Sequence, residues 1–377
     1  MKKDLKIVVD DKIPFLKGVL EPFANVEYYT GSEISGEKVK DADALIIRTR
    51  TKCNRALLDK SKVKFIATAT IGFDHIDTVY CESAGIKWTN APGCNSGSVK
   101  QYIASVLVRL SMKYHFQFSE KTIGVVGHGN VGSKVAKLAS DLGMKVLVND
   151  PPLQRTGNPY PYVTLEEIKE KADIITFHVP LNKEGDDKTL YMADDAFFKS
   201  LKQECLIINS SRGEVVNNAA LKNALINKQI KGAVLDVWEN EPNIDLELLQ
   251  LVDFATPHIA GYSADGKANG TAMSVQAVSD YFGFGLKKWF PENVQLPDNT
   301  NIKVALNGKK PSDLISELIL TTYDIKNDDE YLRKSIETFE KQRGSYPLRR
   351  EFQNYTPILE KDLFELKGLI KELGFKS

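Results

Sequence analysis

Residues 121–136 read KTIGVVGHGNVGSKVA and set Gly127, Gly129 and Gly132 in the spacing G-x-G-x-x-G. The apolar run before the first glycine predicts a buried strand, and the periodicity of Val131–Leu142 predicts a helix after it. In such a strand–turn–helix the first glycine permits a tight turn and the second lets the backbone approach a pyrophosphate. The third glycine lets the helix pack closely on the sheet. The segment is therefore typical of a dinucleotide-binding domain.

Two further features concern the nucleotide itself. At the start of the predicted helix, the N–H groups of Asn130 and Val131 are available to phosphate oxygens. Asp150 stands 18 residues after Gly132, where the next apolar run ends. A carboxylate at this spacing accepts hydrogen bonds from the ribose hydroxyls and repels a 2′-phosphate. Asp150 therefore predicts NAD, rather than NADP, as the cofactor.

The composition excludes several classes of protein. The chain has 377 residues, enough for two or three domains at about 100–200 residues each. Its 50 Lys and Arg residues balance 50 Asp and Glu residues, which argues against binding nucleic acid or an anionic membrane through bulk charge. Hydrophobic residues make up 42% of the chain, and no apolar run approaches the roughly 18 residues of a membrane span. A globular protein is expected.

The cysteines and the N-terminus indicate the cellular compartment of the protein. Near the N-terminus the uninterrupted apolar stretch runs only from Ile7 to Val9, which is too short for the core of an export signal. The cysteines lack the paired spacing of a metal site; they are Cys53, Cys81, Cys94 and Cys205. We therefore expect reduced thiols, no metal site and a cytoplasmic location.

Strand-like and helix-like segments alternate along the chain. Apolar, β-rich runs predict strands at Lys6–Val9, Ala44–Ile47, Phe65–Ala69, Thr122–Val126, Lys145–Asn149, Ile174–His178, Leu206–Asn209 and Ala233–Val237. Helical periodicity between them includes Val131–Leu142, Leu165–Lys171 and Asn217–Asn227. This alternation is typical of parallel sheets covered by helices on both faces. The predicted fold class is α/β, with two doubly wound parallel-sheet (Rossmann-like) domains, a cleft between them and a small C-terminal α+β domain.

Composition also marks the boundaries between these domains. The first sheet would occupy about residues 1–95, and the apolar helix Val99–Leu110 would lead from it to the second. Residues 289–297 read WFPENVQLP, and their two prolines interrupt regular structure. The tail beyond this linker is highly charged, and we predict that it is mostly helical, at Ser312–Asp324 and Ile358–Leu373.

Three polar side chains follow predicted strands of the second sheet. Arg212 comes after the run IIN at 207–209, Glu241 follows the run AVLDV at 233–237, and His258 lies in the segment ATPHIAGY. In a doubly wound fold, ligands bind at the carboxyl ends of the strands. Histidine is a general base near neutral pH, a glutamate beside it stabilises the imidazolium, and an arginine fork matches a carboxylate. The set fits the oxidation of an alcohol that lies beside a carboxylate.

Over roughly residues 5–285, the chain resembles the D-isomer-specific 2-hydroxyacid dehydrogenase family. The resemblance rests on the dinucleotide motif and on three further segments, SRG at 211–213, DVWENEP at 236–242 and HIAG at 258–261. The resemblance implies that His258 is the acid/base, that Glu241 supports it, and that Arg212 binds the carboxylate and polarises the carbonyl. Asp236 would face the nicotinamide. The implied domains are a discontinuous substrate domain (1–95 and 259–286) and an NAD domain (96–258), whose cleft would close on the substrate.

Further segments are similar to one branch of the family, which acts on a phosphorylated hydroxyacid and dimerises through a C-terminal domain. They are FIATATIGFDHID at 65–77, NAPGCN at 90–95, TFHVPL at 176–181 and HIAGY at 258–262. The tail is similar to that domain, which implies a homodimer through residues 287–377. The resemblance assigns to the substrate Thr49, Thr70 and Tyr262. It assigns to NAD Gly127, Gly129, Asn130, Val131, Gly132, Asp150, Val179, Ser210, Ser211, Arg212, Asp236 and Gly261.

Val179 and the cations of residues 46–52 bear on the binding of NAD and of the substrate phosphate. Val179 stands where related enzymes often have a threonine, so a hydroxyl contact with NAD would be absent and a backbone contact would remain. The stretch IIRTRTK at 46–52 carries three cations. Because a phosphate needs charged donors, our hypothesis is that Arg48, Arg50 or Lys52 helps to hold the substrate phosphate.

Two alternatives stay open at this point. The chain could be another enzyme of the family, such as a 3-phosphoglycerate dehydrogenase or a glyoxylate/hydroxypyruvate reductase. The ATAT segment at 67–70 and the C-terminal tail argue against this. It could also be an NAD(H)-sensing module like the C-terminal-binding corepressors, which reuse this fold. Those proteins can retain the Arg–Glu–His set, but the chain lacks long disordered recruitment segments.

Overall fold

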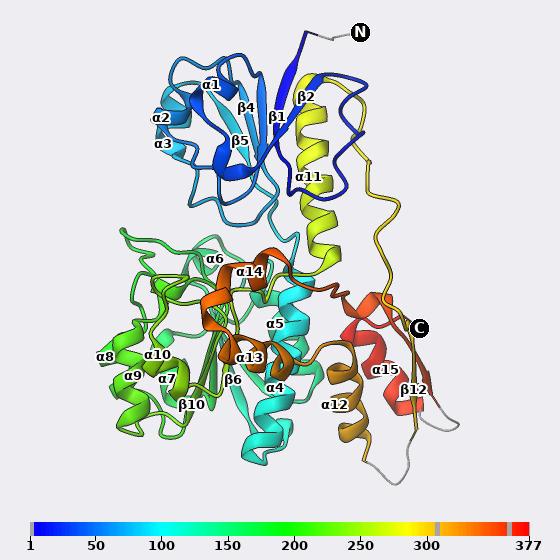
Figure 1. The fold of residues 1–377 in the computed structure, drawn as a ribbon. Coiled ribbons are helices and arrows are strands. Elements are labelled where there is room, and N and C mark those ends of the chain that lie inside the picture. Colours follow the sequence, from blue (N-terminus) through cyan, green and yellow to red (C-terminus); the bar gives the residue numbers. More distant parts are fainter. Residues whose placement is uncertain (1–3, 306–309, 360–363, 377) are drawn as a thin grey trace. The chain divides into compact units, whose positions relative to one another are not determined.

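In the computed structural model, residues 4–305, 310–359 and 364–376 are described (Figure 1). The chain forms two compact units. The N-terminal unit comprises Met1–Asn95 and Ser263–Gln295, and the nucleotide unit comprises Ser96–Tyr262 and Leu296–Ser377. The C-terminal segment thus belongs to the same unit as the glycine motif. The boundaries of the three domains expected from the sequence stay a prediction.

A five-stranded parallel sheet forms the N-terminal unit, in the order β2-β1-β3-β4-β5. Its strands are β1 (Lys6–Asp10), β2 (Asn25–Tyr29), β3 (Ala44–Ile47), β4 (Phe65–Thr68) and β5 (Lys87–Thr89). Its helices are α1 (Gly36–Val39), α2 (Arg55–Leu58), α3 (Thr78–Ser83) and the long α11 (Ala264–Phe282). Val275 and Val278 of α11 join the buried residues of β1, β3 and β4 in one hydrophobic core. The returning helix therefore completes this unit.

The nucleotide unit contains a six-stranded parallel sheet, in the order β11-β10-β9-β8-β6-β7. Its strands are β6 (Thr122–Val126), β7 (Lys145–Asn149), β8 (Ile174–Phe177), β9 (Leu206–Asn209), β10 (Gly232–Leu235) and β11 (Phe254–Ala255). The chain starts at β6, proceeds to β7 at one edge, and then returns past β6 to β8 and beyond. The order reverses between β6 and β8, which is where doubly wound sheets bind ligands.

Two hydrophobic cores cover this second sheet. One lies under α4 (Ser96–Tyr114) and α5 (Gly132–Asp141). The other includes side chains of α7 (Leu165–Lys171), α8 (Asp195–Lys199), α9 (Asn218–Ile226) and α10 (Leu246–Leu251). The short α6 (Pro151–Arg155) follows β7. The two sheets and the small C-terminal sheet confirm the predicted α/β class.

The C-terminal segment packs into the nucleotide unit. It contains the two-stranded parallel pair β12 (Asn301–Val304) and β13 (Thr356–Leu359) and the helices α12 (Pro311–Thr322), α13 (Ile325–Lys334), α14 (Phe339–Gly344) and α15 (Phe364–Leu373). Leu314, Ile315 and Leu318 of α12 are buried in the same core as α4, beside which α12 and α13 lie (Figure 1). Leu332 and Phe339 join the other core. The segment is thus an integral part of the unit.

Most predicted elements match the structure, but one predicted helix in the tail is wrong at its start and three strands were not predicted. The predicted helix Ile358–Leu373 is wrong at its start, because Ile358 and Leu359 belong to β13. Their backbone groups pair with Lys303 and Val304 of β12. This pairing joins segments far apart in the chain, so local periodicity does not reveal it. Strands β2, β5 and β11 were also missed, because they are short or carry charges that hide an apolar pattern.

The four cysteines are all buried. Burial raises the pKa of the Cys205 thiol to about 12, so it stays protonated. Across the part of the chain that the structure describes, no helix combines the length and the apolarity that crossing a bilayer requires.

Candidate active site

The glycine turn joins β6 to α5, and the surroundings of its glycines differ. Gly127 has a φ of 91°, and a Cβ there would lie 2.6 Å from the carbonyl oxygen of His178. A Cβ on Gly132 would lie 1.8 Å from the carbonyl oxygen of Gly127. Around Gly129, by contrast, no described atom lies within 4 Å of the Cβ position. The chain's own packing requires the first and third glycines, whereas the second leaves room for the close approach of a pyrophosphate.

Asp150 lies at the end of β7 and caps α6. Its Oδ1 accepts a hydrogen bond from the N–H of Leu153 at 2.9 Å, and its Oδ2 accepts one from the N–H of His128 at 2.7 Å. These bonds fix the carboxylate beside the glycine turn. Each carboxylate oxygen has a second lone pair, so the group can still accept hydrogen bonds from ribose hydroxyls. The geometry fits the role that we expect for Asp150.

An aromatic cluster beside this turn was not found by sequence reasoning. The imidazole of His128 packs against Tyr160, with ring centroids 4.2 Å apart and the ring planes tilted by 50°, and its Nδ1 lies 3.1 Å from the Tyr162 hydroxyl. Burial is the main cause that lowers the pKa of His128, against the opposing charge of Asp150. Neither the histidine inside the glycine motif nor the two tyrosines in a loop form a sequence pattern that predicts this cluster. Their proximity follows from the return of the chain along β7.

The loop after β9 holds Arg212 and the predicted NAD contacts. Asn209 Oδ1 accepts hydrogen bonds from the backbone N–H of Ser211 at 3.1 Å and from its hydroxyl at 2.9 Å. Asn209 Nδ2 donates to the carbonyl of Arg212 at 2.9 Å, and Arg212 Nη1 donates to the carbonyl of Ser211 at 2.8 Å. The buried Asn209 was quoted in the motif but given no role. It is the residue that shapes this loop.

Ser210 has an unusual environment in the same loop. Its hydroxyl oxygen is buried and has no hydrogen-bond partner among the described residues. Buried hydroxyls normally find a partner, and an orphaned one calls for an explanation such as a ligand. Together with the open side of Gly129, this orphaned hydroxyl fits a bound dinucleotide.

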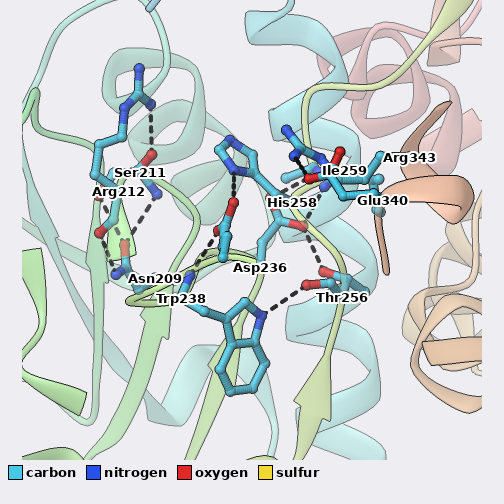
Figure 2. A network of polar contacts seen from close by, with 12 residues as sticks. Asn209, Ser211, Arg212, Asp236, Trp238, Thr256, His258, Ile259, Glu340 and Arg343 are labelled. Carbon is cyan, nitrogen blue, oxygen red and sulfur yellow. Dashed lines mark hydrogen bonds and ion pairs between the residues drawn. The ribbon is translucent and has the colours of Figure 1, made fainter. Parts of the chain in front are cut away.

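His258 lies in a network of polar contacts (Figure 2), and the structure brings it together with Glu241. The Nδ1 of His258 lies 2.8 Å from Oε2 of Glu241, whose Oε1 accepts a hydrogen bond from the N–H of Trp238 at 2.9 Å. Burial favours the neutral acid of Glu241, but the hydrogen bonds of His258 and Trp238 and the charges of His258 and Arg343 together hold the pKa of Glu241 below its ordinary value. The carboxylate is therefore ionised and holds one nitrogen of the imidazole, so the other nitrogen is left for chemistry.

Asp236 anchors the backbone around His258. Its carbonyl accepts a 2.7 Å hydrogen bond from the N–H of His258, whose φ is 57°. Its carboxylate accepts hydrogen bonds from the N–H groups of Ile259 at 2.7 Å and Ala260 at 3.0 Å, and from the Thr256 hydroxyl at 2.7 Å. Burial is the main cause that raises the pKa of Asp236. Its contact with the nicotinamide stays a prediction.

The remaining predicted residues of this unit lie close to the same loops. A Cβ on Gly127 would lie 2.9 Å from Cγ1 of Val179, which places Val179 at the glycine turn. The N–H of Tyr262 donates to the carbonyl of Ile259 at 2.8 Å, so Gly261 and Tyr262 form a tight turn directly after His258. The Tyr262 ring meets the ring of Tyr346 edge to face, with centroids 5.9 Å apart.

Thr49 and Thr70 belong to the N-terminal unit. They follow β3 and β4, which are neighbouring parallel strands, so both lie at the carboxyl edge of that sheet. Thr70 donates a hydrogen bond to the carbonyl of Gly72 at 2.9 Å and lies 2.8 Å from the Thr68 hydroxyl. Their contacts with substrate stay a prediction.

The three cations of the stretch 46–52 differ in their surroundings. Arg48 Nε lies 3.7 Å from Oδ2 of the buried Asp10, and Arg48 Nη1 donates to the carbonyl of Lys12 at 3.1 Å. Arg48 therefore neutralises a buried carboxylate. Arg50 and Lys52 are exposed, and the hypothesis that a cation of this stretch helps to hold the substrate phosphate stays a prediction.

The chain is similar to known dehydrogenases over its length. The sequence profile described as "D-isomer specific 2-hydroxyacid dehydrogenase, NAD binding domain" matches residues 100–260, and one described as a domain of unknown function matches 295–374. The erythronate-4-phosphate dehydrogenase of Bacteroides fragilis is 50% identical over 358 residues, which is 95% of this chain and 100% of the relative. That of Proteus mirabilis is 38% identical over 99% of both chains.

Solved structures show the same fold. The D-lactate dehydrogenase of Aquifex aeolicus, complexed with NAD and lactic acid, matches with a TM-score of 0.62 and 27% identity, over 75% of this chain and 96% of its own. The NAD⁺-bound 3-phosphoglycerate dehydrogenase of Entamoeba histolytica matches with a TM-score of 0.61 and 28% identity, over 77% and 99%. On this similarity and on the geometry of its site, the chain belongs to the D-isomer-specific 2-hydroxyacid dehydrogenases, as a member of the erythronate-4-phosphate dehydrogenase family.

Proposed function

We propose that this protein oxidises 4-phospho-D-erythronate with NAD to (R)-3-hydroxy-2-oxo-4-phosphobutanoate. This reaction belongs to the biosynthesis of pyridoxal and pyridoxine 5′-phosphate, vitamin B6. The observation that carries the proposal is the contact of His258 with Glu241 at 2.8 Å, in the same unit as the dinucleotide turn and Arg212. The identity of 50% to a relative of that name supports the choice of substrate.

His258 acts as the acid/base in this proposal. Its Nδ1–H donates to Glu241, so Nε2 is free to accept the proton of the substrate's 2-hydroxyl group. Glu241 stabilises the imidazolium that results. Bound NAD supplies the hydride acceptor, and the substrate carbon that loses hydride and proton becomes the 2-oxo group. The reverse direction uses the same residues, with His258 as the acid.

Arg212 and the residues around it bind the reacting end of the substrate. The guanidinium of Arg212 would fork onto the carboxylate and polarise the neighbouring carbonyl. Gly127, Gly129, Asn130, Val131 and Gly132 would hold the pyrophosphate, and Asp150 the ribose. On the nicotinamide side, the proposed contacts are Val179, Ser210, Ser211, Asp236 and Gly261. Thr49, Thr70 and Tyr262 are the proposed substrate contacts.

The C-terminal segment is the proposed dimer contact, and the cytoplasm is the proposed location. Within the described part of the segment, several large apolar side chains are exposed: Tyr331, Leu348 and Ile358. A contiguous exposed apolar patch is typical of an interface, and these side chains are the proposed contacts of a homodimer formed by residues 287–377.

The direct test is the formation of NADH, followed by its absorbance, with purified protein, NAD and an oxoacid trap. We expect strong preference for 4-phosphoerythronate over 3-phosphoglycerate and D-lactate, and loss of turnover in His258→Ala. Turnover of another hydroxyacid instead would keep the family and overturn the substrate. Tight NAD binding without turnover of any of the three would favour the sensing module.

A further inference from the structure

A second arginine lies at the catalytic pair, and it comes from the C-terminal segment. Arg343 belongs to α14, and its side chain is only 19% exposed. Figure 2 draws Arg343 and Glu340 in the same network as His258. The positive charge of Arg343 is one of the causes that lower the pKa of Glu241. None of the predictions from the sequence involved this residue.

The guanidinium of Arg343 has donors that the described residues leave unused. Its Nη1 donates to Oε1 of Glu340 at 3.0 Å. Its Nε is buried and has no hydrogen-bond partner in the described part of the chain. An arginine carries five N–H groups in a rigid fork, and a buried donor without an acceptor is destabilising. An anionic ligand would satisfy these donors.

The position of Arg343 is well fixed. Phe339, one turn earlier in α14, is 1% exposed and belongs to the core of the unit. Gln342 Nε2 donates to the carbonyl of Ser335 and to the Thr338 hydroxyl, both at 2.9 Å. The helix is therefore anchored by side chains in the turn that leads to the arginine. Such anchoring suits a group that must meet a ligand in a defined geometry.

Another buried cation in this region is already in use. Arg349 Nη2 donates to the carbonyls of Ser98 at 2.8 Å and Ala260 at 2.6 Å, and its guanidinium lies 4.4 Å from the ring centre of Tyr323. Arg349 supports the backbone of the loop after His258. Arg343 differs because its guanidinium donates to no backbone carbonyl among the described residues.

The substrate in the proposed function carries two anionic groups at its opposite ends. Its carboxylate is next to the carbon that reacts and is assigned to Arg212. Its phosphate lies two carbons beyond the reacting carbon, and needs a cation of its own with several donors. Arg212 follows β9 and Arg343 comes from α14, and Figure 2 draws His258 between them. A substrate whose reacting carbon meets His258 can thus present an anion to each.

We propose that Arg343 binds the phosphate of the substrate and determines the preference for a phosphorylated hydroxyacid. This proposal rests on the proposed function and deepens it. It gives the C-terminal segment a role in recognition, within the same chain, in addition to the proposed dimerisation.

The test compares 4-phosphoerythronate with D-erythronate, which lacks only the phosphate, in wild-type protein and in Arg343→Gln. We expect kcat/KM for the phosphorylated substrate to fall about 30- to 100-fold, mostly through KM, as for the loss of a charge-assisted hydrogen bond. The kcat/KM for D-erythronate should change less than about threefold. Competitive inhibition by inorganic phosphate should weaken in parallel. Arg343→Lys, which keeps the charge but not the fork, should lie in between.

Lys341→Gln is the matched control, because Lys341 is an exposed cation on the same helix. It should behave like the wild type with both substrates. An equal loss for both substrates in Arg343→Gln, or no loss for either, would overturn the proposal and leave the proposed function intact. Failure of wild-type protein to oxidise 4-phosphoerythronate would overturn the proposed function instead. The pair 3-phosphoglycerate and glycerate would then test Arg343 in the same way.

Discussion

Gly129 and Gly132 stand three residues apart in one turn, yet the chain needs them for different reasons. A side chain on Gly132 would collide with the backbone of its own turn, whereas one on Gly129 would meet no described atom. The sequence motif alone does not distinguish these cases, because it records only that both residues are glycine. At the scale of single residues, the structure therefore separates what folding requires from what binding requires.

The matched pair of alanine variants tests this separation. Gly132→Ala is expected to lower the free energy of unfolding by about 3 kcal/mol or more, because a backbone carbonyl cannot easily move away. Gly129→Ala is expected to unfold like the wild type but to bind NAD at least about tenfold more weakly. Thermal melting and a titration with NADH, followed by its fluorescence, measure the two effects. Wild-type NAD affinity in Gly129→Ala would contradict the assignment of the turn.

Glu241 gives a prediction that depends on pH. Its pKa is lowered in the folded protein, so its ionised form stabilises the fold above the unfolded value of about 4.3, and this contribution is lost as the pH falls through the folded value. Glu241→Gln should therefore destabilise the protein more at pH 7 than at pH 3. Urea unfolding at both pH values measures this difference. A penalty that does not change with pH would show that the charge of Glu241 is not the stabilising feature.

The same substitution tests catalysis. Glu241→Gln should lower kcat about 100-fold or more, since an amide does not stabilise the imidazolium of His258. NAD affinity should stay near the wild-type value, because the described contacts of Glu241 go to His258 and Trp238. Steady-state kinetics and NADH titration separate the two quantities. Retention of wild-type kcat would exclude Glu241 as the partner of His258.

At the scale of elements, strands with a local apolar pattern were predicted from the sequence, whereas strands defined by long-range pairing were not. The central strands were predicted because each is a buried apolar run, as in ALII at β3 and LIIN at β9. The pairing of β12 with β13 joins residues near 301 and 356, and periodicity within either segment carries no sign of it. The place of Arg343 of α14 in the same network of polar contacts as His258 was missed for the same reason. Catalytic residues at strand ends are foreseeable, whereas a residue that arrives from a distant helix is not.

Arg349, in the segment between α14 and β13, gives a prediction about both stability and catalysis. Arg349→Leu should lower the free energy of unfolding by about 3–5 kcal/mol, because carbonyls of Ser98 and Ala260 lose a buried charged donor. The loop after His258 would loosen, so kcat should fall as well. Arg349→Lys should recover part of both losses. Urea unfolding and NADH formation measure them, and an unchanged kcat would show that this loop does not depend on Arg349.

At the scale of the whole molecule, the C-terminal segment cannot be removed cleanly to test dimerisation. Its apolar residues share a core with α4 and α5, so a chain that ended near residue 286 would expose that core. Substitution of exposed residues is the better experiment. Tyr331, Leu348 and Ile358 are 56%, 43% and 47% exposed, and all three lie in the segment.

Replacing these three side chains by aspartate should convert a dimer into a monomer. The added charges would disfavour burial at an interface but should leave the fold intact, because the side chains are already in contact with water. Sedimentation equilibrium measures the mass, and thermal melting checks the fold. An unchanged dimer mass in a folded variant would place the interface elsewhere.

The path of the chain through the nucleotide unit also has a consequence for its synthesis. The unit is built from residues 96–262 and 296–377, and the chain completes part of the other unit in between. A ribosome therefore releases the glycine motif and the catalytic pair well before it releases the helices that cover α4. Until residues 296–377 have been synthesised, the buried side of α4 lacks its cover and is open to wrong partners or chaperones. Completion of this site therefore waits for a segment that follows the catalytic pair by tens of residues.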